Sequence, residues 1–154
     1  MLTEEILIVP AKEEDIPAMS TLLGKLFTIE DDFEVDENKQ KSGLNLMLSN
    51  GPGRQVLVAK IDGTVIGMCS AQINISTSEG GISVLIEDLI INEDYRNHGI
   101  GRKLLACIKE WALSKSAKRM TLLLDIRNSK ALSFYSRQGW ILTNMISMHS
   151  KLNA

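Results

Sequence analysis

The stretch of sequence that decides the fold is Arg96-Asn97-His98-Gly99-Ile100-Gly101. It lies between an apolar run at residues 82–91 and an amphipathic helical pattern that begins at Ile100. A turn that joins a strand to a helix favours anions, because the first N–H groups of the helix have no intrahelical acceptor. Gly99 and Gly101 lack a Cβ, so the backbone can approach a large anion such as a pyrophosphate. We therefore interpret the stretch as a phosphate-binding loop.

Two common nucleotide motifs are excluded. A dinucleotide fingerprint needs a third glycine three residues after the second, where this chain has Leu104. The P-loop pattern, which ends in Gly-Lys-Ser/Thr, occurs nowhere in the chain. The remaining pattern, Arg-x-x-Gly-x-Gly with Tyr95 before the arginine and an apolar segment at 89–91, resembles the acyl-coenzyme-A loop of the GNAT acetyltransferase superfamily.

A second motif follows an apolar run at residues 121–126, and its sequence is Asn128-Ser129-Lys130-Ala131-Leu132-Ser133-Phe134-Tyr135-Ser136-Arg137-Gln138-Gly139-Trp140. It resembles the other half of the GNAT signature, in which Asn, Ala, Phe-Tyr and Gly-aromatic recur at this spacing. The direct resemblance covers residues 82–140. It implies an α/β (α+β) fold with a central, mostly antiparallel sheet of six to seven strands, a splayed parallel pair and about four helices.

Length and composition are those of one globular domain, which we place at residues 1–154. The net charge of −2 disfavours nucleic acid as a partner. Cys69 and Cys107 are isolated, which argues against a disulfide framework or zinc site, and we expect both in the core with no metal bound. The N-terminal apolar run is too short for a signal peptide or a membrane span. We expect a cytoplasmic protein that binds no membrane.

The segment before residue 82 predicts a strand, two helices and a hairpin. The strand at 6–9 is closed by Pro10, and a helix follows with acids at 13–15 in its first turn and an apolar face up to Phe27. A weaker helix through Leu44 and Leu48 ends at 50–53. Asp62-Gly63 is a hairpin signal between strands at 55–61 and 65–75.

From residue 82 the order is strand, glycine loop, helix, strand, helix, which predicts parallel pairing of the two strands. The tail predicts two final strands, at 140–142 and 146–152, although apolar and polar residues alternate imperfectly there.

Glu87 and Asp88 interrupt the apolar strand at 82–91. Buried carboxylates are costly, so we expect one of them to face a polar site. Strict alternation would put Glu87 on the face of Leu89 and Ile91, with Asp88 and Ile90 on the other. The resemblance implies that the backbone of Leu89, Ile90 and Ile91 holds the pantetheine arm of the cofactor and that Glu87 is the general base. The alternative is that Glu87 is a salt-bridged strand residue.

A base is needed because an alkyl amine with a pKa near ~10.4 is protonated at neutral pH and cannot attack a thioester. The resemblance places Tyr135 as the acid that protonates the leaving thiolate. The alternative for Tyr135 is packing beside Phe134, which we expect in the core.

The resemblance also assigns the coenzyme's diphosphate to the side chains of Arg96 and Arg102 and to the backbone N–H groups of the loop, which are those of Asn97, His98, Gly99, Ile100, Gly101 and Arg102. Asn128 either binds the cofactor arm or caps the following helix. We expect the side chains of His98 and His149 to have no catalytic role, His98 being at the surface and His149 in a strand. The acids between the first two helices could attract an amine, but a solvated loop is the favoured interpretation; they are Glu30, Asp31, Asp32, Glu34, Asp36 and Glu37.

The expected function is transfer of an acetyl group from acetyl-coenzyme A (acetyl-CoA) directly to a primary amine in a ternary complex. The alternative is a GNAT-fold sensor or interaction module that binds acyl-coenzyme A without turnover. The acceptor, a small amine or a peptide, is not specified by the sequence. The resemblance also suggests a homodimer.

Overall fold

The computed structural model describes residues 3–30, 32–49 and 51–152, and the chain divides into two units, Met1–Leu122 and Leu123–Ala154. The first unit contains β1 (Leu7–Pro10), the 3-10 turn η1 (Glu13–Asp15), α1 (Ile16–Ile29), α2 (Glu37–Ser49), β2 (Arg54–Ile61), β3 (Thr64–Ser76), β4 (Gly81–Ile91), the 3-10 turn η2 (Glu93–Tyr95), α3 (Ile100–Ser114) and β5 (Arg119–Leu122). The second unit contains α4 (Ser129–Arg137).

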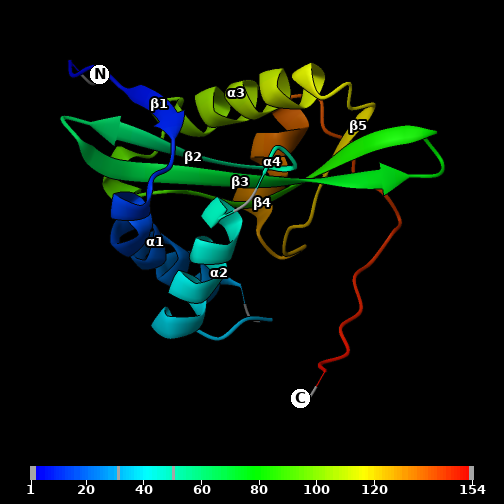
Figure 1. Cartoon of the computed structure of the whole chain (residues 1–154), viewed down its shortest axis with the longest axis horizontal. Helices are drawn as coiled ribbons and strands as arrows, with labels where there is room; N and C mark the ends of the chain where they lie inside the picture. Colours follow the sequence, from blue (N-terminus) through cyan, green and yellow to red (C-terminus); the bar gives the residue numbers. More distant parts are fainter. Residues whose placement is uncertain (1–2, 31, 50, 153–154) are drawn as a thin grey trace. The chain divides into compact units, whose positions relative to one another are not determined.

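The strands form one sheet in chain order, β1-β2-β3-β4-β5 (Figure 1). The first four are joined by antiparallel pairing, and β4 pairs with β5 in parallel. The predicted mixed sheet with one parallel pair is therefore confirmed. The predicted number of six to seven strands is wrong, because the described residues form five.

The missing strands are those predicted in the tail. Residues 138–152 form no strand, and their large apolar side chains are exposed: Ile141, Leu142, Met145, Ile146, Met148 and Leu152. Alternation predicts which face of a strand would be buried, but it does not specify the sheet edge that would pair with the strand. Strand β5 is likewise Arg119–Leu122 rather than 121–126, and Leu123 and Ile126 beyond it are exposed.

Helices cover both faces of the sheet in the first unit. Figure 1 shows α3 on one face and α1 with α2 on the other. The core on the α1 side joins α1 and α2 to the sheet through Ile16, Met19, Leu22, Leu23, Leu44, Val56, Val58, Met68 and Ile90. On the other face, Leu104 and Ile108 of α3 are fully buried, as the helical spacing predicts.

The hairpin between β2 and β3 turns at the predicted dipeptide. Asp62 and Gly63 both have positive φ, 47° and 79°, as a two-residue type I′ turn requires. The turn places Ile61 opposite Thr64 and Lys60 opposite Val65. A β-bulge at Ile66 then shifts the pairing by one residue, so Val58 lies opposite Met68 and Val56 opposite Ser70. Met68 and Ser70 therefore share the sheet face that α1 covers.

The first helix begins differently from its prediction. The acids expected in its first turn lie in η1 instead, and Asp15 is buried. Its Oδ1 is 2.8 Å from Lys60 Nζ, and its Oδ2 accepts a hydrogen bond of 2.9 Å from the Lys12 backbone N–H. This ion pair connects η1 to β2.

Candidate active site

Strands β4 and β5 pair over only the first half of β4. The parallel register runs from Ser83 opposite Arg119 to Ile86 opposite Leu122, where β5 ends. Along residues 87–91, no strand of the described chain pairs with that edge of β4. The backbone groups along this edge, including those of Leu89, Ile90 and Ile91, are therefore outside the β4–β5 ladder. This is the separation that the resemblance implied.

A β-bulge lies where the two strands part. Ser70 pairs with Glu87 and Met68 pairs with Ile90, so the single residue Cys69 faces two residues of β4, Asp88 and Leu89. Asp88 has φ +54°, a left-handed conformation in which Asp and Asn are enriched among non-glycine residues.

Because of the bulge, the side chains of β4 do not alternate between the two sheet faces as predicted. Glu87 shares the α1 face with Ile90, because their partners Ser70 and Met68 share it. Ile91 lies on the α3 face, where its Cδ1 is 2.7 Å from the position that a Cβ on Gly67 would occupy. Strict alternation fails because the extra residue reverses the pleat once.

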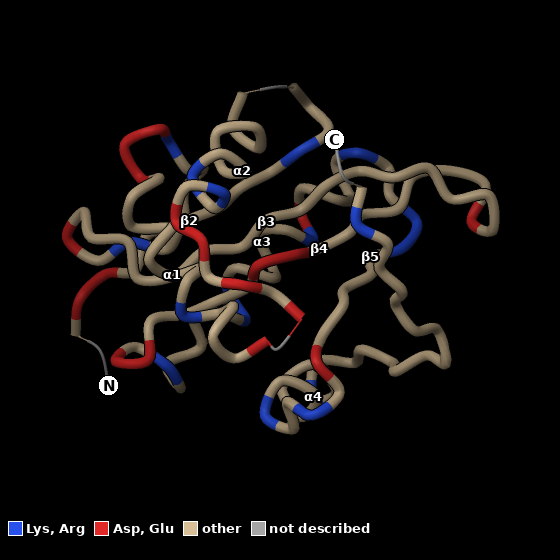
Figure 2. Tube along the Cα trace, turned by 90° about the horizontal axis from the view of Figure 1, so that it is seen from below, with Lys and Arg blue, Asp and Glu red and all other residues tan. Residues whose placement is uncertain are grey.

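The two carboxylates differ in environment. Glu87 is exposed, whereas Asp88 is half-buried and accepts a hydrogen bond of 3.2 Å from Ser70 Oγ at its Oδ2. Burial, the largest cause, and the nearby charge of Glu87 together raise the pKa of Asp88 to about 6, and the Ser70 hydrogen bond acts in the opposite direction. In Figure 2 the charged residues of β4 are acidic, and the adjoining strand β3 carries none.

The glycine loop continues from the end of β4 into α3. Arg96 Nε donates a hydrogen bond of 3.0 Å to the Ile91 carbonyl, which ties the loop to the strand. Asn97 and Gly99 have φ of +65° and +77°, and Gly99 is the N-cap of α3. The first helical bond joins the Lys103 N–H to the Gly99 carbonyl at 3.1 Å.

The N–H groups that precede this bond have no intrahelical acceptor; they belong to Ile100, Gly101 and Arg102. Within the loop, the side chains of Arg96, His98 and Arg102 are exposed, as expected for His98.

The second unit holds the other two predicted site residues. Asn128 Oδ1 accepts a hydrogen bond of 3.1 Å from the Ala131 N–H, so its amide caps α4, one of the two predicted roles. Tyr135 is half-buried and makes edge-to-face contacts with Phe134 and Trp140, at ring-centroid distances of 5.0 and 5.7 Å. Phe134 is half-buried rather than in the core, and His149 lies in the tail outside any strand.

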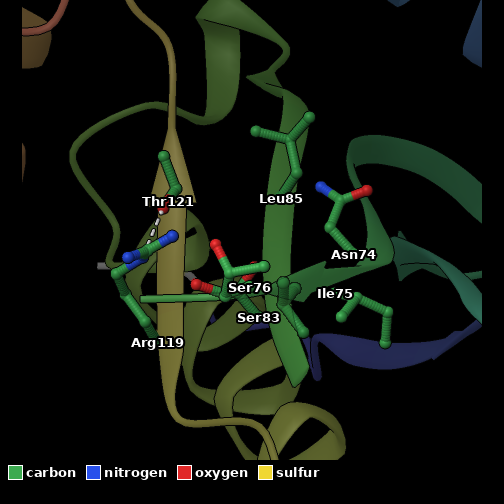
Figure 3. Close-up of a pocket in the computed structure, with 9 residues that line it drawn as sticks. Asn74, Ile75, Ser76, Ser83, Leu85, Arg119 and Thr121 are labelled. Carbon is green, nitrogen blue, oxygen red and sulfur yellow. Dashed lines mark hydrogen bonds between the residues drawn. The ribbon is translucent and has the colours of Figure 1, made fainter. Parts of the chain in front are cut away.

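A pocket of about 350 Å³ lies where β4 and β5 begin (Figure 3). Its lining includes Ser83 and Leu85 of β4, which alternate with Glu87 and so share its face. The positively charged residue that lines the pocket is Arg119. It forms an ion pair with Glu79 at 3.1 Å and donates a hydrogen bond of 3.3 Å to Thr121. The pocket is thus polar, with its charge already neutralised.

Part of the acidic stretch between α1 and α2 lies at the N-terminus of α2. Asp36 Oδ1 accepts a hydrogen bond of 3.1 Å from the Lys39 N–H, and Glu37 pairs with Lys41 at 2.7 Å. Asp32 and Glu34 are exposed, in line with a solvated loop. Asp31, like Asn50 of the predicted turn at 50–53, lies outside the described residues.

Sequence reasoning missed two features of the site. Ser70 carries no sequence signal, because a serine in a strand is common and its partner is distant in sequence. For Asp88, the sequence indicates a charge in an apolar strand but not a β-bulge; two adjacent carboxylates in such a strand are the signal for one.

The described residues contain no group of three or more His, Cys, Asp or Glu side chains placed to hold a metal ion. Cys69 is buried, as expected, whereas Cys107 is half-buried rather than in the core; both are free thiols. Over the described chain, no helix has the length and apolar character needed to cross a membrane.

Comparison with known proteins identifies the class. A sequence model of the acetyltransferase (GNAT) family matches residues 17–140. The chain belongs to this family.

Among curated relatives, an uncharacterized N-acetyltransferase of Archaeoglobus fulgidus is 33% identical over 84 residues, which are 54% of this chain and 57% of that protein. The uncharacterized N-acetyltransferase YhfO of Bacillus subtilis is 29% identical over 85 residues, 55% of this chain and 57% of YhfO. The chain thus spans about 57% of the length of these relatives.

Solved structures show the same fold. A possible acetyltransferase from Clostridium difficile 630 superposes with a TM-score of 0.83 at 18% identity, covering 98% of this chain and 100% of the other. Aminoglycoside N-acetyltransferase AAC(6')-Iy, in complex with CoA, gives a TM-score of 0.83 at 16% identity and 97% coverage of both chains.

Proposed function

We propose that the chain is an acetyl-CoA-dependent N-acetyltransferase that moves the acetyl group directly to a primary amine while both substrates are bound. The observation that carries the proposal is the position of Glu87, at the point where β4 leaves β5 and on the sheet face opposite α3. Family membership supports the class of reaction.

The residues of the first unit fit acetyl-CoA, which supplies the acetyl thioester when bound. The free β4 edge at Leu89, Ile90 and Ile91 offers backbone hydrogen bonds to the pantetheine arm. For the diphosphate, the loop offers the N–H groups that precede the α3 ladder and two exposed arginines; its proposed contacts are Arg96, Asn97, His98, Gly99, Ile100, Gly101 and Arg102. Asn128 of the second unit is a further proposed contact through the part of its amide that does not cap α4.

Glu87 is the proposed general base, since it is exposed and can accept a proton from the acceptor's ammonium directly or through a water. Tyr135 is the proposed acid for the thiolate. Its contacts with Phe134 and Trp140 would hold the ring in one orientation, which favours a fixed proton donor.

The proposed acceptor is a small amine or a peptide whose body occupies the pocket beside Leu85. The pocket shares the Glu87 face of β4 and offers hydroxyl and amide groups from Asn74, Ser76 and Ser83, which suits a polar acceptor. Two free thiols support a reducing, cytoplasmic location. A homodimer is proposed from the exposed apolar side chains of the tail.

The test measures release of free coenzyme A from acetyl-CoA across a panel of amines and peptides, with wild type beside Tyr135→Phe. We expect release with one class of acceptor, a lower kcat in the variant and an unchanged Kd for acetyl-CoA by calorimetry. Equal turnover in the variant would remove Tyr135 from the acid role. Tight acetyl-CoA binding without turnover of any acceptor would support the alternative, a coenzyme-binding module without catalysis.

A further inference from the structure

Asp88 is a half-buried carboxylate that lacks a cation. No lysine, arginine or histidine of the described chain pairs with it, whereas the buried Asp15 has Lys60 at 2.8 Å. A carboxylate withdrawn from water without a cation is costly. A positively charged ligand would supply the missing partner, and an ammonium is the charge that the acceptor amine brings.

Ser70 is placed to serve Asp88 in both protonation states. Its Oγ is 3.2 Å from Asp88 Oδ2 and also 3.2 Å from the Glu87 carbonyl oxygen, but a hydroxyl has only one proton to donate. When Asp88 is ionised, Ser70 donates to the carboxylate. When Asp88 is protonated, its O–H can donate to Ser70 Oγ while Ser70 donates to the Glu87 carbonyl. Neither state leaves the buried Ser70 hydroxyl unsatisfied.

We propose that Asp88 is a second proton acceptor of the reaction, which receives the proton leaving the acceptor's ammonium, by way of Glu87 or a water, and is held by Ser70 in both states. The inference rests on the proposed function. Glu87 is the exposed group that first meets the ammonium, and Asp88 is the group that retains the proton.

The protons balance over the reaction. The ammonium gives one proton to Asp88, and the nitrogen lone pair forms a bond to the thioester carbon as the carbon–sulfur bond breaks. The nitrogen loses a second proton in becoming an amide, and the departing thiolate takes up one proton. Asp88 then returns its proton to solvent, so the net products are the amide, the free thiol and one proton.

The surroundings of Asp88 make its titration specific. Glu87 on β4 and Cys69 on β3 are the titratable groups that interact with its charge. Helix α1 packs on this face through apolar side chains, Ile16, Met19, Leu22 and Leu23. Burial is the largest cause that opposes ionisation of Asp88. The charge of Glu87 opposes ionisation too, and the Ser70 hydrogen bond favours it.

A first experiment observes Asp88 without substrate, by NMR titration of its carboxyl carbon. We expect a midpoint near pH 6 in wild type. Glu87→Gln should lower the midpoint because a neighbouring negative charge is lost, and Ser70→Ala should raise it because the hydrogen bond to the ionised form is lost. A midpoint near 3.8 that neither substitution moves would overturn the proposal.

A second experiment measures kcat/KM against pH with the acceptor found in the coenzyme A release assay. Wild type should lose activity below about pH 6, as Asp88 becomes protonated. Asp88→Asn keeps the size and the tolerance for left-handed φ, so the bulge should survive. We expect this variant to lose the fall in activity near pH 6 and about 100-fold in rate, the lower end of the usual range for proton transfer by a side chain.

Asp94→Asn, the same change at an exposed position, is the matched control and should behave as wild type. An Asp88→Asn variant with the wild-type rate and the wild-type fall in activity near pH 6 overturns this inference alone. Absence of transfer by wild type to every acceptor overturns the proposed function, and this inference with it.

Discussion

At the scale of single residues, a carboxylate whose pKa is raised by folding lowers the stability of the protein once it ionises. Folding raises the pKa of Asp88 from 3.8 to about 6. The stability that the protonated side chain contributes is therefore fully present below pH 3.8 and is lost as pH rises through 6. At neutral pH the ionised side chain should cost about 3 kcal/mol. Replacing it by Asn removes that cost.

We therefore compare the free energy of unfolding of Asp88→Asn with that of wild type at two pH values. The difference in favour of the variant should be about 2 kcal/mol larger at pH 7.5 than at pH 4.5. Urea denaturation at the two pH values measures this difference. Asp94→Asn should show no such gain. An Asp88→Asn gain that is equal at both pH values would mean that the ionisation of Asp88 is not coupled to folding.

Gly101 is the second residue with a specific consequence. A valine at this position would place a branched side chain in the first turn of α3, beside the N–H groups proposed to bind diphosphate. We expect Gly101→Val to weaken acetyl-CoA binding at least about tenfold, measured by calorimetry, through steric exclusion of the anion.

Gly43→Val is the control for the Gly101 change, because Gly43 is also helical and a Cβ there would have nothing within 4 Å. It should carry the same penalty in helix propensity without the loss of binding. Wild-type affinity in Gly101→Val would remove the loop from the cofactor site.

The sequence predicts the site residues whose own side chain is unusual in its segment. It does not predict the site residues whose role depends on a partner in another strand. The charges of Glu87 and Asp88 stand out in an apolar strand, and the glycines of the loop mark its turn. The roles of Ser70 and of the bulge at Asp88 depend on which strand lies opposite and in which register. A single sequence does not contain that information.

At the scale of secondary-structure elements, one buried ion pair joins η1, which leads into α1, to β2. Asp15→Ala would leave the Lys60 ammonium, whose side chain is 16% exposed, without its carboxylate. It would also remove the acceptor of the Lys12 N–H. We expect a loss of about 3 kcal/mol in the free energy of unfolding, measured by urea denaturation, because an uncompensated buried charge remains.

Glu14→Ala is the control in the same 3-10 turn, because Glu14 is exposed and is not part of the ion pair. It should lower the free energy of unfolding only slightly. The double variant Asp15→Ala/Lys60→Met should recover part of the loss by removing the stranded charge. If Asp15→Ala is no worse than Glu14→Ala, the pair does not stabilise the junction.

Elements with local signals were predicted well. The turn at Asp62-Gly63 is determined by two residues that tolerate positive φ, and α3 by the apolar spacing of its own side chains. The end of β5 and the strands of the tail were wrong. Their existence depends on a pairing partner, and no residue within these segments specifies one.

At the scale of the whole molecule, the tail is the feature that calls for a partner. Ile146 and Met148 are 85% and 90% exposed. Apolar side chains exposed in series mark interaction surfaces, and we propose a second copy as the partner. Ile146→Ser/Met148→Ser should therefore shift the protein from dimer to monomer, measured by light scattering at micromolar concentration.

Lys151→Ser, a change at an exposed polar position in the same tail, should leave the mass unchanged. A monomeric wild type would contradict the proposed homodimer. The order of the motifs predicted the fold class because α/β crossovers leave few topologies, whereas association between copies has no comparable pattern in one chain.

The bulge in β4 has a consequence for how such a site can arise. If Asp88 is deleted, Leu89 falls opposite Cys69, and Glu87, Ile90 and Ile91 keep their present partners Ser70, Met68 and Gly67. The strand without Asp88 is thus an ordinary, regularly pleated strand with the same apolar core. A single codon would separate the two forms, so one residue is enough to add or remove this carboxylate without changing the partners of Glu87, Ile90 or Ile91.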